Sequence, residues 1–408
     1  MLPSSSPSRA IDASRAAPVS RRIDAGRAGA PSAAGRLVGR SLARRLLLAL
    51  PLAVYAAYFL LKPFYLFPSG SPQIADFLAL GLIVALIAVG TGAPGPDARR
   101  MSLFAGLFIV YAAVVNVVWA ALLGNAELFK APVFLLFNFA LFFLTLLLSG
   151  RYGDRFHRWT IAAVIASVLL VALLSLVSQS PTRRQAVSFE NPNQLGYWSL
   201  LSVSIFLLCS LRVHVHWALK VAICCASFYL VALSLSKAAI LSAAALFALA
   251  FVTKPRQLLA AIPIAAAIAV GMAGSELVEN LMWRLSNIGE QADDSLARRG
   301  YALLGRFPYY LLFGAGQGAY ERFYEWNPRE FHSTLGTVFF CYGAIGLSLF
   351  GLFLLQILRT AGLYRFAFLG PAFLYGVTHQ GLRFSLFWTL LAIVATARPA
   401  GGRSGIRP

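Results

Sequence analysis

Long apolar stretches, separated by short polar segments and by one long loop, make up the chain from residue 46 to residue 397. A helix needs about 17 to 25 mainly apolar residues to cross a hydrocarbon layer roughly 30 Å thick. The pattern predicts an all-α polytopic integral membrane protein with about twelve transmembrane helices. Their predicted ranges are 46–61, 76–91, 101–123, 131–149, 159–178, 194–211, 217–235, 238–253, 257–273, 333–358, 361–378 and 384–397.

Polar segments divide the chain into five regions. A tail rich in Arg, Ala, Ser and Pro is too polar to bury a core and is predicted to be disordered and cytoplasmic. Nine helices follow it, then a long loop, three more helices and a short second tail. The predicted boundaries are 1–45, 46–273, 274–332, 333–397 and 398–408.

The long loop 274–332 contains eight of the fifteen acidic residues of the chain, which favours an external location. Within it, the apolar stretch "YALLGRFPYYLLF" at 301–313 is too short to span a membrane, and Pro308 interrupts it. We therefore expect a short interfacial or re-entrant helix in this large external loop.

Charge distribution indicates which side of the membrane each loop occupies. The composition, 59% hydrophobic and 12% charged with a net charge of +20, is that of a membrane protein. With the N-terminus inside, 23 of the 35 basic residues but only four of the 15 acidic residues fall in cytoplasmic segments. This asymmetry predicts that both termini are cytoplasmic. The basic charge then reflects topology and contact with membrane lipids, and no nucleic-acid partner is expected. An Arg-rich, acid-poor leader also fits an organelle transit peptide.

A polar cluster lies at the predicted outer end of the sixth helix, in "PTRRQAVSFENPNQ" at 181–194. Arg183 and Arg184 place two guanidinium groups on the side that disfavours positive charge. Guanidinium binds phosphate through paired donors, so either bulk phospholipid or a specific anionic headgroup could be the partner. Asn191 and Asn193 flank a proline that can begin the helix while the amides cap it.

His332 ends the long loop directly before a predicted helix. An imidazole near its ordinary pKa can take a proton from a hydroxyl group, as glycosyl transfer to an alcohol requires. The alternative is a histidine at a helix start that faces lipid headgroups. No cofactor is expected, and no metal, because the adjacent carboxylates Asp293 and Asp294 point apart and no further ligands accompany them.

Three other features of the predicted outer face have both a structural and a functional interpretation. Glycines 314, 316 and 318 in "LFGAGQGAYERF" predict a tight turn, whose exposed amides could also meet a phosphate. Lys237 lies in a short external turn, and Arg383 lies at the outer end of the last helix. Each alone could be an interfacial anchor.

Taken in order, these stretches resemble the bacterial O-antigen ligase and O-antigen or exopolysaccharide polymerase family. The resemblance runs from Glu190 to about Trp388 and contains Asn-Pro-Asn at 191–193 and Ser-Lys at 236–237. It continues with "RRGYALLGRFPYYLLFGAGQG" in the long loop, a histidine before a Gly-rich helix and "LRFSLFW" near the end. Lys237 departs from the family, which usually has Arg at this position.

The resemblance implies a metal-independent glycosyltransferase in the bacterial inner membrane. Such an enzyme takes a glycan from an undecaprenyl-pyrophosphate donor and passes it to a glycan or lipid A core acceptor at the outer face. On this reading His332 is the general base, and Arg299 matches the family's loop arginine, with Arg298 as an equal candidate. Binding of the donor pyrophosphate is then assigned to Arg183, Arg184, Arg298, Lys237 and Arg383, and Asn191 and Asn193 to the polar site.

The sequence "ENPNQLGY" resembles an exopolysaccharide polymerase more than a ligase to lipid A core. Twelve helices with both termini inside are also a common transporter layout, so a polysaccharide-related transporter is a further alternative, as is a non-catalytic assembly subunit. Transporters tend to carry charges at the midplane of the membrane, whereas the polar residues here gather on one face.

Overall fold

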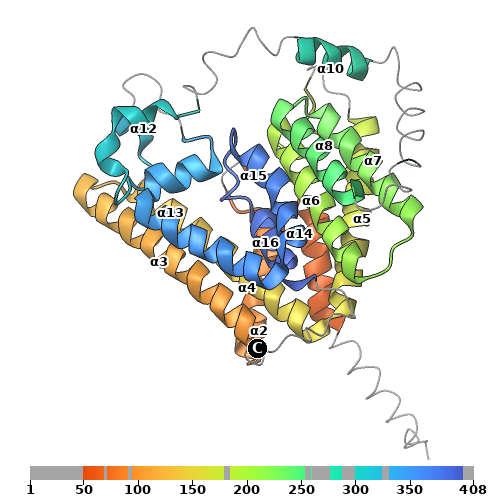
Figure 1. Cartoon of the computed structure of the whole chain (residues 1–408), viewed down its shortest axis with the longest axis horizontal. Helices are drawn as coiled ribbons and strands as arrows, with labels where there is room; N and C mark the ends of the chain where they lie inside the picture. Colours follow the sequence, from red (N-terminus) through yellow and green to blue (C-terminus); the bar gives the residue numbers. More distant parts are fainter. Residues whose placement is uncertain are drawn as a thin grey trace, which may run out of the picture. The chain divides into compact units, whose positions relative to one another are not determined.

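The structure of the protein is a computed structural model. It describes residues 49–68, 71–90, 94–178, 184–252, 259, 276–286, 299–323 and 330–397. All regular secondary structure in these ranges is helical (Figure 1). Several predictions concern residues outside them, namely both tails, the ninth predicted helix at 257–273, Arg183, Arg298, Asp293 and Asp294.

The order of the helices follows the apolar pattern of the sequence. The first is Ala49–Leu61. It is followed by α2 (Ile74–Ala88), α3 (Pro96–Leu123), η1 (Ala126–Phe129), α4 (Lys130–Tyr152), α5 (Asp154–Val177), α6 (Pro192–Arg212), α7 (Trp217–Leu233), α8 (Lys237–Val252) and α10 (Glu276–Ser286). The C-terminal half contains α12 (Ala302–Arg306), η2 (Pro308–Tyr310), η3 (Tyr320–Phe323), α13 (Thr334–Ala361), α14 (Leu363–Phe366), η4 (Ala367–Leu369), α15 (Gly370–Gly376) and α16 (Ser385–Thr396).

In the part of the chain that the structure describes, five helices are long and apolar enough to cross a membrane. They are α3, η1 with α4, α5, α6 and α13. Five shorter apolar helices accompany them, namely Ala49–Leu61, α2, α7, α8 and α16. This architecture is that of an all-α, membrane-embedded protein.

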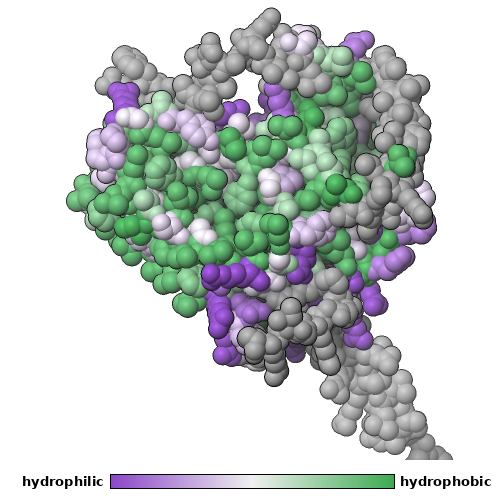
Figure 2. Space-filling model, viewed as in Figure 1, coloured by the Kyte–Doolittle hydropathy of each residue, from purple (hydrophilic) through white to green (hydrophobic). Residues whose placement is uncertain are grey.

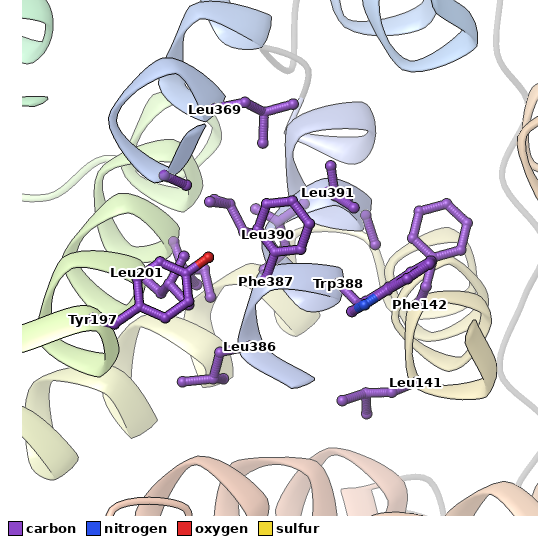
Figure 3. Packing of buried hydrophobic residues seen from close by; sticks show 14 of the residues in the cluster. Leu141, Phe142, Tyr197, Leu201, Leu369, Leu386, Phe387, Trp388, Leu390 and Leu391 are labelled. Atoms are coloured by element: carbon purple, nitrogen blue, oxygen red, sulfur yellow. The ribbon is translucent and has the colours of Figure 1, made fainter. Parts of the chain in front are cut away.

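The helices α6 and α16 lie at the centre of the packing. In α6, 89% of the most apolar 18-residue window is buried, against 33% in α3. The twelve residues of α16 extend only about 18 Å at 1.5 Å per residue. They pack against α4, α6 and α13. Figure 3 shows this contact through Leu386, Phe387, Trp388, Leu390 and Leu391 of α16, Leu141 and Phe142 of α4, and Tyr197 and Leu201 of α6.

Apolar side chains also cover the outside of the helices. Hydrophobic residues form a broad belt over the region of α3 and α13, with hydrophilic residues toward the top and bottom of the view (Figure 2). On α3, Leu103 and Val110 expose 59% and 62% of their surface. Contiguous apolar surface on this scale needs a non-aqueous environment, which hydrocarbon supplies.

The eleventh predicted helix differs from the structure. The range 361–378 contains three short consecutive elements, α14, η4 and α15, in place of one continuous helix. Gly362 adopts a φ of 76° directly before them, and Pro371 lies in the first turn of α15. Both residues interrupt helical hydrogen bonding. The apolar composition of this range was read correctly, but its division into short elements was not.

The helix α13 is broken at Gly343, which has φ 67° and ψ −173°. The segment 311–316 of the long loop fills the break: the amides of Ala315 and Gly316 donate to the carbonyl oxygens of Phe340 and Cys341 at 3.0 and 2.8 Å. In return, the amide of Ala344 donates to the carbonyl oxygen of Leu311 at 2.7 Å. The amides of Gly314, Ala315 and Gly316 are thus committed to protein carbonyls, which favours the structural reading of this part of the Gly-rich turn over phosphate binding.

The stretch predicted as a short interfacial or re-entrant helix consists of two pieces, α12 and η2. Phe307 separates them with a φ of −129°, directly before Pro308. The proline therefore interrupts the helix where the sequence indicated. The segment that follows, 311–316, is the one that joins the break in α13.

Candidate active site

The candidate site lies where four loops meet at one end of the helices. These loops precede α6, connect α7 to α8, precede α13 and connect α15 to α16. Hydrogen bonds between residues far apart in the sequence connect them, so the site is a product of tertiary packing.

The start of α6 supplies the first part of the site. Asn191 is the N-cap, and its side-chain oxygen accepts a hydrogen bond from the amide of Asn193 at 2.8 Å, with Pro192 at the first helical position. The predicted cap is therefore confirmed for Asn191. Asn193 has another role, because its side-chain oxygen accepts a hydrogen bond from Nη2 of Arg184 at 2.8 Å. The Nε atom of Arg184 donates to the carbonyl oxygen of Ser234 at 3.1 Å, which ties this arginine to the turn after α7.

Arg299 and His332 meet through the main chain. The amide of His332 donates to the carbonyl oxygen of Arg299 at 2.9 Å. The Nη1 atom of Arg299 donates to the carbonyl oxygen of Thr378 in the α15–α16 loop. No other hydrogen bond from the Arg299 side chain reaches a residue that the structure describes. Arg299 therefore retains donors for a ligand.

Further hydrogen bonds hold the three segments around residues 300, 333 and 379 together. The hydroxyl of Tyr301 contacts Oγ of Ser333 at 2.9 Å and also donates to the carbonyl oxygen of Val377. Oγ1 of Thr334 donates to the carbonyl oxygen of His379 at 3.2 Å and accepts from the amide of Gly381 at 2.9 Å. These bonds fix the α15–α16 loop against the start of α13.

The side chain of His332 is exposed, and its tautomer follows from one contact. Its Nδ1 atom lies within hydrogen-bond distance of the carbonyl oxygen of Glu330. A carbonyl oxygen can only accept, so Nδ1 carries the proton and Nε2 of the neutral ring has a free lone pair. The exposed nitrogen is thus prepared to accept a proton.

A second histidine, His379, completes the cluster. Its ring stacks on Tyr375 with 4.4 Å between centroids and 18° between planes. Tyr375 stacks in turn on Tyr197, at 4.3 Å and 8°. Nδ1 of His379 lies 3.0 Å from Oγ1 of Thr378. The hydroxyl of Tyr375 donates to the carbonyl oxygen of Asn193 at 2.9 Å, so the ring stack connects both halves of the site.

Burial and positive charge act together on these groups. Burial, together with the charges of Arg299, His332 and Arg184, lowers the pKa of His379 to about 3. Burial also lowers the pKa of the Arg299 guanidinium. Arg184, Arg299, His332 and His379 are therefore close enough to interact electrostatically. The site concentrates positive charge around a neutral imidazole, an arrangement that attracts an anion.

Of the other predicted donor-binding residues, the structure describes Lys237 and Arg383. Lys237 is the first residue of α8, three positions after Ser234, and α8 packs against α15. Arg383 forms an ion pair with Glu330, with 2.6 Å between Nη1 and Oε1. Arg183 and Arg298, adjacent in sequence to Arg184 and Arg299, lie outside the described residues.

Sequence reasoning assigned no role to His379 or to Tyr375. The histidine lies in "FLYGVTHQGLRF", 47 positions after His332. The helical-like spacing of Tyr375 and His379, four residues apart, was the available signal for their stacking.

In comparisons with known proteins, the chain matches no protein-family model and no curated protein sequence. Its class is therefore defined by its own features: an all-helical, membrane-embedded protein with a polar cluster of arginines and histidines at one helix end. The cluster can hold an anionic group and can accept a proton from a neighbouring hydroxyl.

Proposed function

We propose that the protein is a glycosyltransferase that moves a glycan from undecaprenyl pyrophosphate to an acceptor sugar hydroxyl. The observation that carries the proposal is the pairing of His332 with Arg299. An exposed imidazole with its lone pair on Nε2 is joined through the main chain to an arginine that retains free donors. Proton acceptor and anion ligand are the two functions that this reaction requires.

In the proposed reaction, the oxygen of the acceptor hydroxyl attacks C1 of the donor sugar, and Nε2 of His332 takes the proton of that hydroxyl. The bond between C1 and the diphosphate oxygen breaks, and the lipid diphosphate leaves with the electron pair. Arg184 and Arg299 stabilise the negative charge that develops on the leaving group. No step calls for a metal ion.

The proposal places the reaction at the outer face of the bacterial inner membrane, with about twelve helices and both termini cytoplasmic. Two features support it. The site residues gather at one helix end, and the opposite ends of the described helices carry a set of basic residues that includes Arg99, Arg151, Arg155, Arg158, Arg212, Arg359 and Arg365. The loop 274–332, which contains eight acidic residues, joins the site end of α13.

The purified protein should release undecaprenyl pyrophosphate and lengthen the glycan when given only the lipid-linked donor, without an ion gradient. Deletion of the gene in the cell distinguishes a growing glycan from lipid A core as the acceptor. Loss of all polymer with short lipid-linked units remaining identifies a polymerase, whereas free polymer with bare lipid A core identifies a ligase. Donor movement that depends on a gradient, without any new glycosidic bond, would instead show a transporter.

A further inference from the structure

Tyr301 lies two residues after Arg299, and its side chain contacts both sequence neighbours of His332. Its ring meets Phe331 edge to face, with 5.4 Å between centroids, and its hydroxyl oxygen lies 2.9 Å from Oγ of Ser333. Phe331 and Ser333 are completely buried. One tyrosine side chain therefore contacts the chain directly before and directly after the histidine.

The same hydroxyl reaches the loop between α15 and α16. It lies within hydrogen-bond distance of the carbonyl oxygen of Val377. Val377 directly precedes Thr378, whose carbonyl oxygen accepts the hydrogen bond from Nη1 of Arg299. Two adjacent carbonyl groups therefore hold the segment 299–301, one through the tyrosine and the other through the arginine.

The direction of these hydrogen bonds follows from what each group can donate. The Tyr301 hydroxyl has one hydrogen, and the carbonyl oxygen of Val377 can only accept it. The contact with Ser333 must then run the other way, so that the serine hydroxyl donates to the tyrosine oxygen. Oγ of Ser333 in turn accepts from the amide of Gly336 at 3.1 Å. A continuous relay of hydrogen bonds thus leads from the first turn of α13 to the end of α15.

We propose that Tyr301 is a positioning residue, whose hydroxyl holds Arg299 and His332 in the relative arrangement that transfer requires. The inference rests on the proposed function and adds a residue that acts through the anion ligand and the proton acceptor. Hydrogen bonds in a chain strengthen one another, so loss of the central hydroxyl weakens the whole relay. The buried Ser333 hydroxyl then also loses its acceptor, and no other one is recorded among the residues that the structure describes.

Tyr301→Phe keeps the aromatic ring and removes only the hydroxyl. We expect turnover to fall by roughly tenfold, because a small displacement of reacting groups costs far more in rate than in stability. The melting temperature should fall by only a few degrees. Tyr364→Phe on α14 is the matched control, since no hydrogen bond joins its hydroxyl to a residue that the structure describes. This control should keep the turnover of wild type.

Binding of inorganic pyrophosphate gives a readout that a purely structural role would not change and that does not require transfer. Tyr301→Phe should weaken this binding by about threefold, as for one lost hydrogen bond. In the Arg299→Ala background it should have no effect, because its influence passes through that arginine. An equal loss in both backgrounds would contradict the positioning role. If wild type binds pyrophosphate but transfers no glycan, the proposed function fails and the coupling of Tyr301 to Arg299 is still measured.

Ser333→Ala removes the serine hydroxyl of the relay and tests it independently if Tyr301→Phe folds poorly. We expect a loss of turnover in the same direction. The double variant with Tyr301→Phe should lose much less than the product of the two single losses, because both changes break the same relay. Wild-type turnover in either folded single variant, or a double variant that shows the full product, would overturn the inference.

Discussion

The main-chain amide of His332 donates a 2.9 Å hydrogen bond to the carbonyl oxygen of Arg299. The two residues are thus placed by the backbone, and a change to either side chain leaves this contact in place. Their contributions to binding and to proton transfer can therefore be measured separately.

Substitution His332→Ala should remove proton transfer and leave the cationic ligands intact. We expect turnover to fall by about 10²- to 10⁴-fold, the usual contribution of a general base, with little change in donor affinity. The measurement is initial rate and donor binding for folded protein across about pH 6 to 9. His214→Ala is the control, since His214 is exposed in the short loop between α6 and α7. Near-normal turnover of His332→Ala over this range would show that another group takes the proton.

Substitution of the arginines should reduce ligand affinity as well as turnover, unlike substitution of His332. Arg299→Ala or Arg184→Ala removes a charged donor to phosphate, so transfer should fall together with pyrophosphate affinity, by roughly tenfold or more each. Lys237→Arg restores the geometry of a guanidinium at the start of α8 and should preserve activity if Lys237 touches the diphosphate. Unchanged pyrophosphate binding in both alanine variants would remove them from the donor site.

Gly381 provides a test of the loop that carries His379. A Cβ atom at this position would collide with the hydroxyl of Tyr197 and lie 3.1 Å from Oγ1 of Thr334. We expect Gly381→Ala to destabilise the protein by about 1 to 3 kcal/mol, as overpacking does, and to lower transfer. The double variant with Tyr197→Phe should recover part of the loss, because it removes the colliding oxygen. Thermal unfolding in detergent measures both effects.

The control for this series is Gly351→Ala, since a Cβ atom there meets nothing within 4 Å. A helix-interior alanine at such a position should be neutral or stabilising by up to about 1 kcal/mol. Equal behaviour of the two alanine variants would mean that the α15–α16 loop is packed less closely than the structure indicates.

Acid should destabilise the protein partly through His379. The ordinary histidine pKa is 6.5, and burial with Arg299, His332 and Arg184 lowers it to about 3 in the folded protein. Between these values the unfolded chain binds a proton that the folded protein does not, so stability is full above pH 6.5 and falls as pH decreases. His379→Gln removes the part of this pH dependence that comes from His379. Its melting temperature should therefore drop less than that of wild type between about pH 7.5 and pH 5.

The comparison of wild type with His379→Gln can also contradict the prediction. If wild type and His379→Gln lose the same stability on acidification, the ring already takes up its proton in the folded state. The positive groups around it would then be farther away than their electrostatic effect indicates.

The topology can be tested with single cysteines on a cysteine-free background. Ser286 is exposed at the end of α10 in the long loop, and His214 is exposed between α6 and α7. An impermeant thiol reagent added to intact cells with a permeable outer membrane should label Ser286→Cys and not His214→Cys. The reverse pattern would place the candidate site on the cytoplasmic side. Removal of the native cysteines breaks no disulfide, since all four are free thiols.

Much of the fold was predictable because lipid imposes a simple rule on sequence. Apolar length determined where most helices lie, and the Asn-Pro-Asn signal marked the start of α6, where Asn191 forms the cap. The break in α13 was not predictable in the same way. Gly343 resembles any other glycine in a Gly-rich helix until the segment 311–316 provides partners for the freed backbone groups.

The candidate site was predictable only in part for a related reason. Charge and topology placed Arg184, Arg299 and His332 on one face, and the structure brings these three together. The role of His379 depends on a loop that returns to Thr334 and Arg299, contacts that span 45 and 79 positions. Local sequence patterns contain no information about such pairings. The number of membrane crossings stays a prediction, since several described apolar helices are shorter than a bilayer is thick.

The junction at Gly343 limits how the long loop can be exchanged for a loop of another sequence. Its segment 311–316 provides hydrogen-bond partners for main-chain groups within α13, so a transplanted loop with different geometry would leave those groups without partners inside the protein. A chimera with an exchanged loop should therefore transfer the loop together with the first half of α13. The segment that must be exchanged as one unit therefore ends inside α13 and not at the start of that helix.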